Sequence, residues 1–442
     1  MDTIISYSGG SLPCAIGIVR LSGDDSWDIF DKIFVTKNKK EPKKMLYGSA
    51  LSRDGKVIDR APLANGCRNK YFGTDGFRGE ANCNLTSMQA YKVGRFLGWY
   101  FRSPLSGCTD ENYRPRIVIG KDTRRSSYMF EYAIVAGLTA SGADPYMLHV
   151  TTTPSVSFVT EREDFDCGVM ISASHNPYTD NGIKLVNRRG EKINDDTIAV
   201  IEAYLDGDCT LPPATGDGIG RIIDYAAGRN RYVGYLISLA ANSYKDFRVG
   251  LDCANGSAWM IGRSVFEALG AKTYVTGAEP DGLNINVDCG STHIENLQKL
   301  VLEKHLDIGF AFDGDADRCL LADEKGNMID GDKVMAVCGK QLRSEGKLSG
   351  DTIVGTVMSN LGLHVFLKEN GIDILTTKVG DRYVLEEMIK KGYNIGGEQS
   401  GHMIVSDFAT TGDGQHTAVK VLEMLSSMNA KPSAMTNSIQ IY

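Results

Sequence analysis

The stretch Ile308-Gly-Phe-Ala-Phe-Asp-Gly-Asp-Ala-Asp-Arg318 joins an apolar run to three carboxylates and an arginine. The run 308–312 is typical of a buried β-strand. Asp313, Asp315 and Asp317 follow it at alternate positions, where their like charges repel one another. A divalent cation removes this repulsion, and oxygen-only ligands suit a hard ion such as Mg²⁺. The stretch therefore favours a magnesium site at the end of a strand over the alternative, an ordinary acidic turn.

A calcium loop of the EF-hand type is a second alternative for the same segment. Asp313, Asp315, Asp317 and Glu324 fall at the first, third, fifth and twelfth positions of such a loop. However, the sixth position, which needs glycine for a sharp turn, holds Arg318. The flanking segments also have the pattern of strands rather than helices. We therefore reject the calcium loop.

A second polar loop follows the apolar strand in Gly168-Val-Met-Ile-Ser-Ala-Ser-His-Asn-Pro177. It places the hydroxyls of Ser172 and Ser174 beside His175, and such a set is a candidate nucleophile or phosphate carrier. The segment is weak evidence by itself, because serine-rich loops after strands usually serve as turns or helix caps. The Gly-x-Ser-x-Gly elbow of many serine hydrolases is absent from it.

Four motifs occur in a fixed order along the chain. They are Tyr71-Phe-Gly-Thr-Asp-Gly-Phe-Arg-Gly79, Ile171-Ser-Ala-Ser-His-Asn-Pro177, Asp313-Gly-Asp-Ala-Asp-Arg318 and Gly397-Glu-Gln-Ser-Gly-His402. In this order they resemble the α-D-phosphohexomutase family over residues 68–442. The resemblance implies a phosphoryl shuttle, in which a loop serine gives its phosphate to a bound sugar monophosphate. The resulting bisphosphate reorients and returns its other phosphate to the serine.

The resemblance also assigns the catalytic centre. It implies that Ser174 carries the phosphate, and that Asp313, Asp315 and Asp317 bind Mg²⁺ together with an oxygen of the phosphoserine. Lys184, in Asn181-Gly-Ile-Lys184, resembles a general acid/base or a phosphate partner. Its alternative is a surface lysine.

Further residues are assigned in the same way. Arg78 and Arg318 are the cations that the motifs place best, although Arg78 has the alternative of a simple turn residue. Glu398, Ser400 and His402 match the sugar-recognition loop, and His175 is assigned to substrate binding. His402 could also move protons near neutral pH, the alternative being a structural histidine at the start of a strand.

The sugar follows from the pairing of Lys70-Tyr-Phe-Gly-Thr-Asp-Gly76 with the Ser174 loop, which resembles the glucosamine branch of the family. The implied reaction converts glucosamine 6-phosphate to glucosamine 1-phosphate. Ala316 is a mild departure, because this position is often glycine in the family. Phosphomannomutase or phosphoglucomutase activity is the first alternative. A non-catalytic fragment that only binds Mg²⁺ and a phosphosugar is the second.

Composition is that of an ordinary globular protein, with 42% hydrophobic and 23% charged residues among 442. A net charge of −7 argues against a nucleic-acid partner. The family resemblance implies that the partners are sugar phosphates. The ten cysteines show no zinc spacing, and Cys167, Cys253 and Cys338 have the sequence context of small buried side chains. No signal peptide or membrane span is evident, so we expect a cytoplasmic protein.

Strand and helix patterns alternate from residue 112 onward and restart twice. Predicted strands include 116–120, 272–276 and 352–358, and 381–391 is a predicted helix. Before them, Thr86-Ser-Met-Gln89 has the spacing of a capping box at the start of a helix. This alternation favours α/β layers. We predict three consecutive similar α/β/α sandwich domains with mixed sheets, plus a short N-terminal β-rich fragment. The predicted boundaries are 1–60 for the fragment, 61–69 for a junction, and 70–228, 229–330 and 331–442 for the domains. Because open α/β sheets bind ligands at the ends of their strands, the Ser174, Asp313 and Glu398 loops are expected to meet in one cleft.

Both ends of the chain depart from the family. Residues 1–60 resemble the start of a tRNA-modifying GTPase that acts on wobble uridine, where this segment begins a folate-binding domain that forms dimers. A homodimer is therefore a further expectation, whereas GTPase activity is not, because Gly-x-x-x-x-Gly-Lys-Ser/Thr is absent. The family's fourth domain, whose loop holds the distal phosphate of the substrate, does not follow before Tyr442. We expect this difference to impair turnover, because charge-assisted phosphate contacts are strong.

Overall fold

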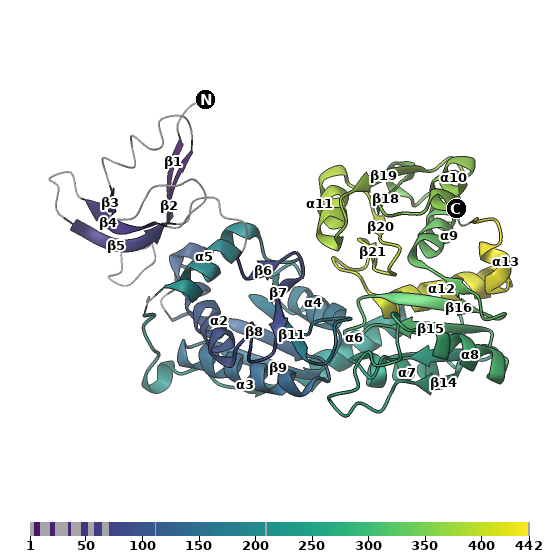
Figure 1. Cartoon of the computed structure of the whole chain (residues 1–442), viewed down its shortest axis with the longest axis horizontal. Helices are drawn as coiled ribbons and strands as arrows, with labels where there is room; N and C mark the ends of the chain where they lie inside the picture. Colours follow the sequence, from purple (N-terminus) through teal and green to yellow (C-terminus); the bar gives the residue numbers. More distant parts are fainter. Residues whose placement is uncertain are drawn as a thin grey trace.

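The computed structural model describes residues 4–8, 18–22, 34–36, 46–51, 57–63, 70–110, 112–207 and 210–440. The ranges before residue 64 are the strands β1 (Ile4–Ser8), β2 (Ile18–Ser22), β3 (Phe34–Thr36), β4 (Leu46–Leu51) and β5 (Val57–Leu63). They form an antiparallel pair, β1-β2, and an antiparallel sheet, β3-β4-β5, to one side of the rest of the chain (Figure 1). The predicted junction begins within β5, and its residues 64–69 lie outside the described residues. The GTPase resemblance stays a prediction, because most of residues 1–60 also lie outside them.

The first domain holds a mixed sheet of seven strands in the order β12-β9-β8-β10-β11-β7-β6. Strands β12, β9, β8 and β10 run parallel, and β11, β7 and β6 continue antiparallel. The capping box predicted at Thr86 is confirmed, since the Thr86 side chain and the N3 residue Gln89 bond each other's backbone at the start of α2. The elements are β6 (Phe72–Gly73), β7 (Gly76–Glu80), α2 (Ser87–Tyr100), η1 (Pro104–Ser106), β8 (Arg116–Lys121), α3 (Arg125–Ala140), β9 (Asp144–Val150), α4 (Thr153–Arg162), β10 (Cys167–Ile171), β11 (Asp180–Asn187), α5 (Asp195–Asp206), η2 (Gly216–Gly218) and β12 (Ile223–Asp224).

The second domain has a sheet of five strands in the order β14-β13-β15-β16-β17. Its first three strands are parallel, and β16 and β17 are antiparallel. Strand β15 is buried along its whole length, as its continuous apolar run predicts. The elements are α6 (Ala226–Ser238), β13 (Arg248–Asp252), α7 (Ala258–Ala268), β14 (Lys272–Thr276), α8 (Glu295–Lys304), β15 (Ile308–Phe312), β16 (Cys319–Asp323) and β17 (Met328–Ile329).

The third domain has a sheet of four strands in the order β19-β18-β20-β21, in which only β21 is antiparallel to its neighbour. Helix α12 also packs on β15 and β16, and one hydrophobic core runs through the second and third domains. The elements are α9 (Gly331–Ser344), η3 (Ser349–Asp351), β18 (Thr352–Thr356), α10 (Leu361–Glu369), β19 (Asp373–Thr377), α11 (Asp381–Lys391), β20 (Ile395–Gly397), β21 (Met403–Val405), α12 (Gly414–Met428) and α13 (Pro432–Thr436).

The three domains repeat one plan, and the predicted α/β/α architecture with mixed sheets is confirmed. In each sheet a run of parallel strands ends beside one antiparallel return strand, which is β11, β16 or β21. The loop that joins the last parallel strand to its return strand carries Ser174 in the first domain, Asp313 in the second and Glu398 in the third. Strand–helix alternation in the sequence does not reveal these return strands, although it does place the loops at strand ends.

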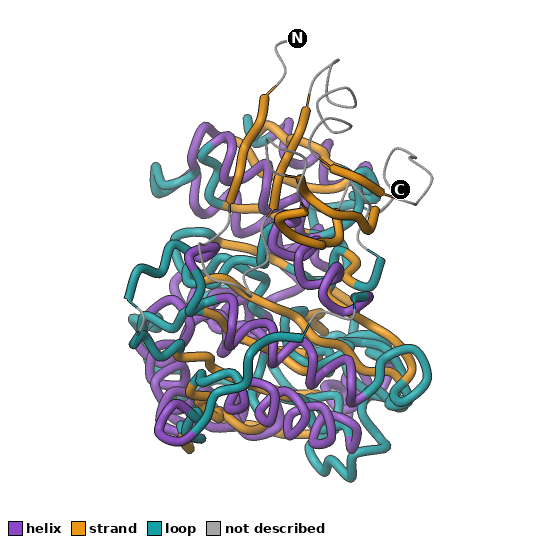
Figure 2. Tube along the Cα trace, turned by 90° about the vertical axis from the view of Figure 1, so that its left-hand side faces the viewer, coloured by secondary structure: helices purple, strands orange, loops and turns teal. Residues whose placement is uncertain are grey.

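Helices and strands are both present throughout the body of the molecule in the view along its long axis (Figure 2). Cys167, Cys253 and Cys338 are buried and free, as their sequence context predicts. Among the described residues, no helix has both the length and the apolar content needed to cross a lipid bilayer.

Candidate active site

The serine loop after β10 is held in an unusual backbone conformation. Ser174 is buried and has a φ of 52°, in the left-handed region that side chains other than glycine rarely adopt. This conformation costs on the order of 1–2 kcal/mol, so surrounding contacts must stabilise it. The Ser174 N–H donates to Ser172 Oγ (2.9 Å), and Ser172 Oγ donates to Asp122 Oδ2 (2.7 Å). From the second domain, Asn286 Nδ2 donates to the carbonyl of Ser174 (2.9 Å).

Arg124, directly after β8, is the main clamp on this loop. Its side chain is fully buried, and its Nε donates to Asp122 Oδ2 (2.7 Å). Its Nη2 donates to the carbonyls of Ser174 and Asn176 (both 2.9 Å), and its Nη1 donates to the carbonyls of Pro177 and of Asp180 (3.1 Å). A planar guanidinium with five N–H groups can serve this many carbonyls at once, whereas an ammonium cannot.

The acidic loop after β15 brings three carboxylates together as predicted. One oxygen from each of Asp313, Asp315 and Asp317 lies within 4.8 Å of the others, and all three residues are buried. The Oδ1 atoms of Asp315 and Asp317 are buried without any hydrogen-bond partner. Burial raises the pKa of Asp313 well above its usual range, and the charges of Asp317 and Asp315 raise it further. A bound divalent cation would give the unpaired carboxylate oxygens a partner, and its charge would offset the repulsion between the three carboxylates.

The serine loop and the acidic loop share one site. Ser174 Oγ donates a hydrogen bond to Asp313 Oδ2, although the two residues are 139 positions apart in the chain. At the N-terminus of α4, the Thr153 N–H donates to the carbonyl of Asp315 (3.0 Å), and Thr153 Oγ1 donates to its carboxylate. The first domain therefore both supplies the hydroxyl and supports the acidic loop.

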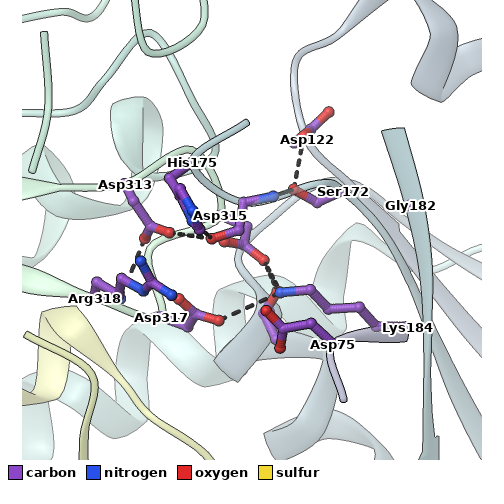
Figure 3. A network of polar contacts seen from close by, with 12 residues as sticks. Asp75, Asp122, Ser172, His175, Gly182, Lys184, Asp313, Asp315, Asp317 and Arg318 are labelled. Carbon is purple, nitrogen blue, oxygen red and sulfur yellow. Dashed lines mark hydrogen bonds and ion pairs between the residues drawn. The ribbon is translucent and has the colours of Figure 1, made fainter. Parts of the chain in front are cut away.

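Lys184 on β11 lies inside this site and is not a surface lysine. Its side chain is 6% exposed, and its Nζ donates to Asp315 Oδ2 (2.6 Å) and to Asp317 Oδ2 (3.3 Å) (Figure 3). Burial lowers the pKa of Lys184, but the surrounding carboxylates outweigh burial and raise it above its usual value. The ammonium group donates two of its three N–H groups to these carboxylates, so one N–H remains for a further acceptor.

Arg78 and His175 flank the serine. Arg78 Nη2 donates to Asp75 Oδ2 (2.7 Å), and its Nη1 donates to Asn176 Oδ1 (3.2 Å) of the serine loop. His175 Nδ1 lies 3.4 Å from Ser174 Oγ. Burial lowers the pKa of His175 to about 4, and the charges of Arg318 and Arg78 contribute, so its imidazole is neutral at pH 7.

The loop after β20 adjoins the acidic loop through the backbone. The Cys319 N–H donates to the carbonyl of Gly401 (3.0 Å), and Arg318 pairs with His402 in an antiparallel bridge. The backbone N–H of Arg318 also donates to Asp313 Oδ1 (3.2 Å). The loops of the second and third domains are thus fixed to each other.

The polar side chains of the loop after β20 have only some of the hydrogen-bond partners that they can take. Glu398 Oε1 accepts from the Gly380 N–H (2.9 Å). Ser400 Oγ and both ring nitrogens of His402 are buried without a hydrogen-bond partner. A bound ligand that offers hydroxyl groups would supply the missing partners.

Comparisons with known proteins agree with this geometry. The sequence matches the phosphoglucomutase/phosphomannomutase α/β/α domains I, II and III over residues 69–209, 230–326 and 330–442. The chain belongs to this family. Its members are sugar-phosphate mutases, so this phosphohexomutase is an enzyme of the isomerase class.

Individual relatives cover most of the chain. The phosphoglucosamine mutase of Lachnospira eligens is 60% identical over 374 residues, which are 84% of this chain and 82% of that protein. The phosphoglucosamine mutase of Streptococcus pneumoniae is 48% identical over the same shares. The crystal structure of a phosphoglucomutase/phosphomannomutase family protein from Burkholderia thailandensis superposes with a TM-score of 0.71 at 25% identity. It covers 84% of this chain and 80% of its own.

Several residues of this phosphohexomutase site were not predicted from the sequence. Asp122 and Arg124 contact the serine loop from within the first domain, and Asn286 contacts it from the second domain. Asp75, Lys192 and Asp381 are bonded to one another where the first domain meets the third. Polar residues directly after the predicted strand Arg116–Gly120 are the only sequence signal for Asp122 and Arg124. Lys192 and Asp381 belong to no motif and are found only through their contacts.

Proposed function

We propose that this chain interconverts glucosamine 6-phosphate and glucosamine 1-phosphate through a phosphorylated Ser174 and a bisphosphate intermediate. The hydrogen bond from Ser174 Oγ to Asp313 carries this proposal, because it joins the phosphate-accepting hydroxyl to the acidic cluster. The choice of an amino sugar is supported by the phosphoglucosamine mutases at 48–60% identity.

The cation that we propose is Mg²⁺. Asp313, Asp315 and Asp317 would hold it with an oxygen of the phosphorylated Ser174, since all these donors are oxygens and two of the carboxylate oxygens have no other partner. When bound, such an ion withdraws negative charge from phosphate oxygens.

The protein side chains divide the remaining work. In the first half-reaction a sugar hydroxyl oxygen attacks the phosphorus on Ser174, the bond from phosphorus to Oγ breaks, and the hydroxyl proton passes to His402. The remaining N–H of Lys184 would donate to the departing Oγ or to a phosphate oxygen, and Arg78 and Arg318 would offset the charge of the transferred phosphoryl group. The second half-reaction reverses these steps on the other phosphate of the sugar.

Binding and orientation fall to three other side chains. The orphaned hydroxyl of Ser400 and the carboxylate of Glu398 would hydrogen-bond the hydroxyl groups of the sugar. His175, neutral and beside Ser174, would hydrogen-bond the transferred phosphate. These roles match the groups that the sequence motifs single out.

Intact-mass spectrometry tests the proposal. After incubation with glucosamine 1,6-bisphosphate and Mg²⁺, the protein should gain the mass of one phosphate. A Ser174→Ala variant should gain nothing, whereas Ser172→Ala should still gain it and so locate the phosphate. An unchanged protein that never gains a phosphate contradicts the proposal and favours a fragment that only binds phosphosugars.

Comparing rates on glucosamine, glucose and mannose 6-phosphates tests the choice of sugar. A faster reaction with mannose or glucose would favour phosphomannomutase or phosphoglucomutase activity. The low turnover expected from the sequence stays a prediction. A homodimer and a cytoplasmic location also stay predictions.

A further inference from the structure

Lys192, which no motif includes, lies where the first and third domains meet. Its Nζ donates to both oxygens of Asp381 (2.8 and 2.6 Å) at the first residue of α11, to Asp75 Oδ1 (3.0 Å) and to the carbonyl of Thr74 (2.9 Å). An ammonium has three N–H groups, and these acceptors use all of them. Lys192 therefore has no donor left for a substrate, and it acts as a cross-link between the two domains.

The two carboxylates that Lys192 joins each touch a residue of the proposed transfer machinery. The other oxygen of Asp75 accepts from Arg78 (2.7 Å), which also bonds Asn176 in the serine loop. On the opposite side, Asp381 Oδ2 lies 3.5 Å from His402 Nε2. One ammonium thus connects the serine loop to the histidine of the third domain.

The charges explain why this cross-link is needed. Asp75 and Asp381 come from different domains and face the same ammonium, so without it the two carboxylates would repel each other across the domain boundary. The side chains of Lys192 and Asp381 are 27% and 13% exposed, so water screens this repulsion only in part. Loss of the cation should therefore shift the third domain away from the first.

Asp381 also bears on the orientation of His402. Neither ring nitrogen of His402 has a hydrogen-bond partner, and its side chain is 3% exposed. A small closing movement would turn the 3.5 Å contact into a hydrogen bond from Nε2–H to Asp381, which would leave Nδ1 unprotonated as an acceptor. Hydrogen bonds of catalytic groups are often long before the substrate binds.

We propose that Lys192, acting through Asp75 and Asp381, is a positioning residue that holds the serine loop and His402 toward the same sugar phosphate. This inference rests on the proposed function, because it needs Ser174 and His402 in their proposed roles. Asp381 keeps the imidazole oriented, and Lys192 keeps Asp381 in place.

The chain offers a matched control at the same boundary. Arg382 follows Asp381 directly and pairs with Asp195 of the first domain (2.7 and 2.8 Å). This pair joins the same two domains, but the Arg382 side chain donates to Asp195 and Glu386 rather than to Asp75 or His402. An Arg382→Gln variant therefore removes an ion pair between the domains without removing the link to the site.

Single-turnover transfer measures the effect. Protein phosphorylated on Ser174 is mixed with increasing glucosamine 6-phosphate, and loss of the phosphate is followed by intact mass. For Lys192→Met we expect a saturating rate lower by about 10- to 100-fold, because misplacement on the order of 1 Å has this cost, with little change in the half-saturating concentration. Lys192→Arg should recover most of the rate, and Arg382→Gln should keep it.

A second variant distinguishes loss of positioning from misfolding. Asp381→Asn keeps the shape of the side chain and should lower the transfer rate by a similar factor. Adding Lys192→Met to it should lower the rate little further, because both changes remove the same contact. In ¹⁵N-histidine spectra of the protein saturated with glucosamine 6-phosphate, the His402 ring should lose its single tautomer in Asp381→Asn but not in Arg382→Gln.

The outcomes separate the inference from the function on which it rests. If Ser174 is phosphorylated but Lys192→Met transfers at the original rate, the positioning role is wrong and the proposed function stands. Equal losses in Lys192→Met and Arg382→Gln would overturn it in the same way. If the unchanged protein never accepts a phosphate, both proposals fall together.

Discussion

Replacing Arg124 with methionine should release the serine loop, and the size of the effect follows from its contacts. The change leaves Asp122 buried without its cation and removes the donors to the carbonyls of Ser174 and Asn176. Removing one partner of a buried ion pair costs about 3–5 kcal/mol. Asn286 still holds Ser174, so the loop should stay in place but open far more often. Amide exchange in this loop should therefore accelerate by about 10²- to 10⁴-fold.

Hydrogen exchange followed by mass spectrometry over residues 172–180 is the direct assay. Arg124→Lys should fall between the original protein and Arg124→Met, because an ammonium can pair with Asp122 but cannot reach all the carbonyls. The matched control is Arg95→Met in the same domain. Arg95 is also buried, and it donates to the carbonyls of Leu211 (2.7 Å) and Pro212 (3.2 Å), away from the site.

The control variant should loosen its own segment and leave residues 172–180 unchanged. If Arg124→Met leaves amide exchange in the serine loop unaltered, or if Arg95→Met accelerates it equally, Arg124 is not the side chain that holds this loop in place. Phosphorylation of Ser174 in Arg124→Met should slow in parallel with the loosening, because the hydroxyl no longer stays beside the acidic cluster.

Three further predictions concern the metal, the acidic loop and pH. Mg²⁺ should raise the thermal unfolding temperature of the protein, with about 2.7 kcal/mol of stabilisation at one hundred times the dissociation constant, and Asp317→Asn should lose this rise. Gly314→Ala should slow phosphorylation of Ser174 and reduce the rise in unfolding temperature with Mg²⁺, because its new Cβ would lie 2.5 Å from the carbonyl oxygen of Ser174. The control Gly234→Ala should change neither quantity, because its new Cβ would have no atom within 4 Å. Burial lowers the pKa of His416 to about 3, so between pH 6.5 and 3 this histidine is protonated in the unfolded chain but not in the folded chain. The free energy of unfolding, measured with urea, should therefore fall as the pH falls through this window. His416→Gln should reduce that slope by up to about 1.4 kcal/mol per pH unit, and an unchanged slope would show that His416 is accessible.

The sequence predicted the elements with strong local patterns. The apolar run 308–312 is strand β15, the periodic segments 272–276 and 381–391 are β14 and α11, and the capping box at Thr86 starts α2. The predicted strand at Thr352–Met358 ends earlier, at Thr356, because Val357 and Met358 form a turn. Helix α4 was not predicted, since its run of serine, threonine and valine lacks a clear apolar stripe.

By itself the sequence determined which chemical groups stand at the ends of which strands. The serine, the carboxylates and the sugar-loop residues each follow an apolar run in a short motif, and such local order is set by spacing along the chain. Only the tertiary structure decided which of these groups meet. Ser174 and Asp313 are 139 residues apart and Lys192 and Asp381 are 189 apart, and contacts over such distances depend on how whole domains pack. Arg124, Asn286 and Lys192 act through their partners, so no local pattern marks them.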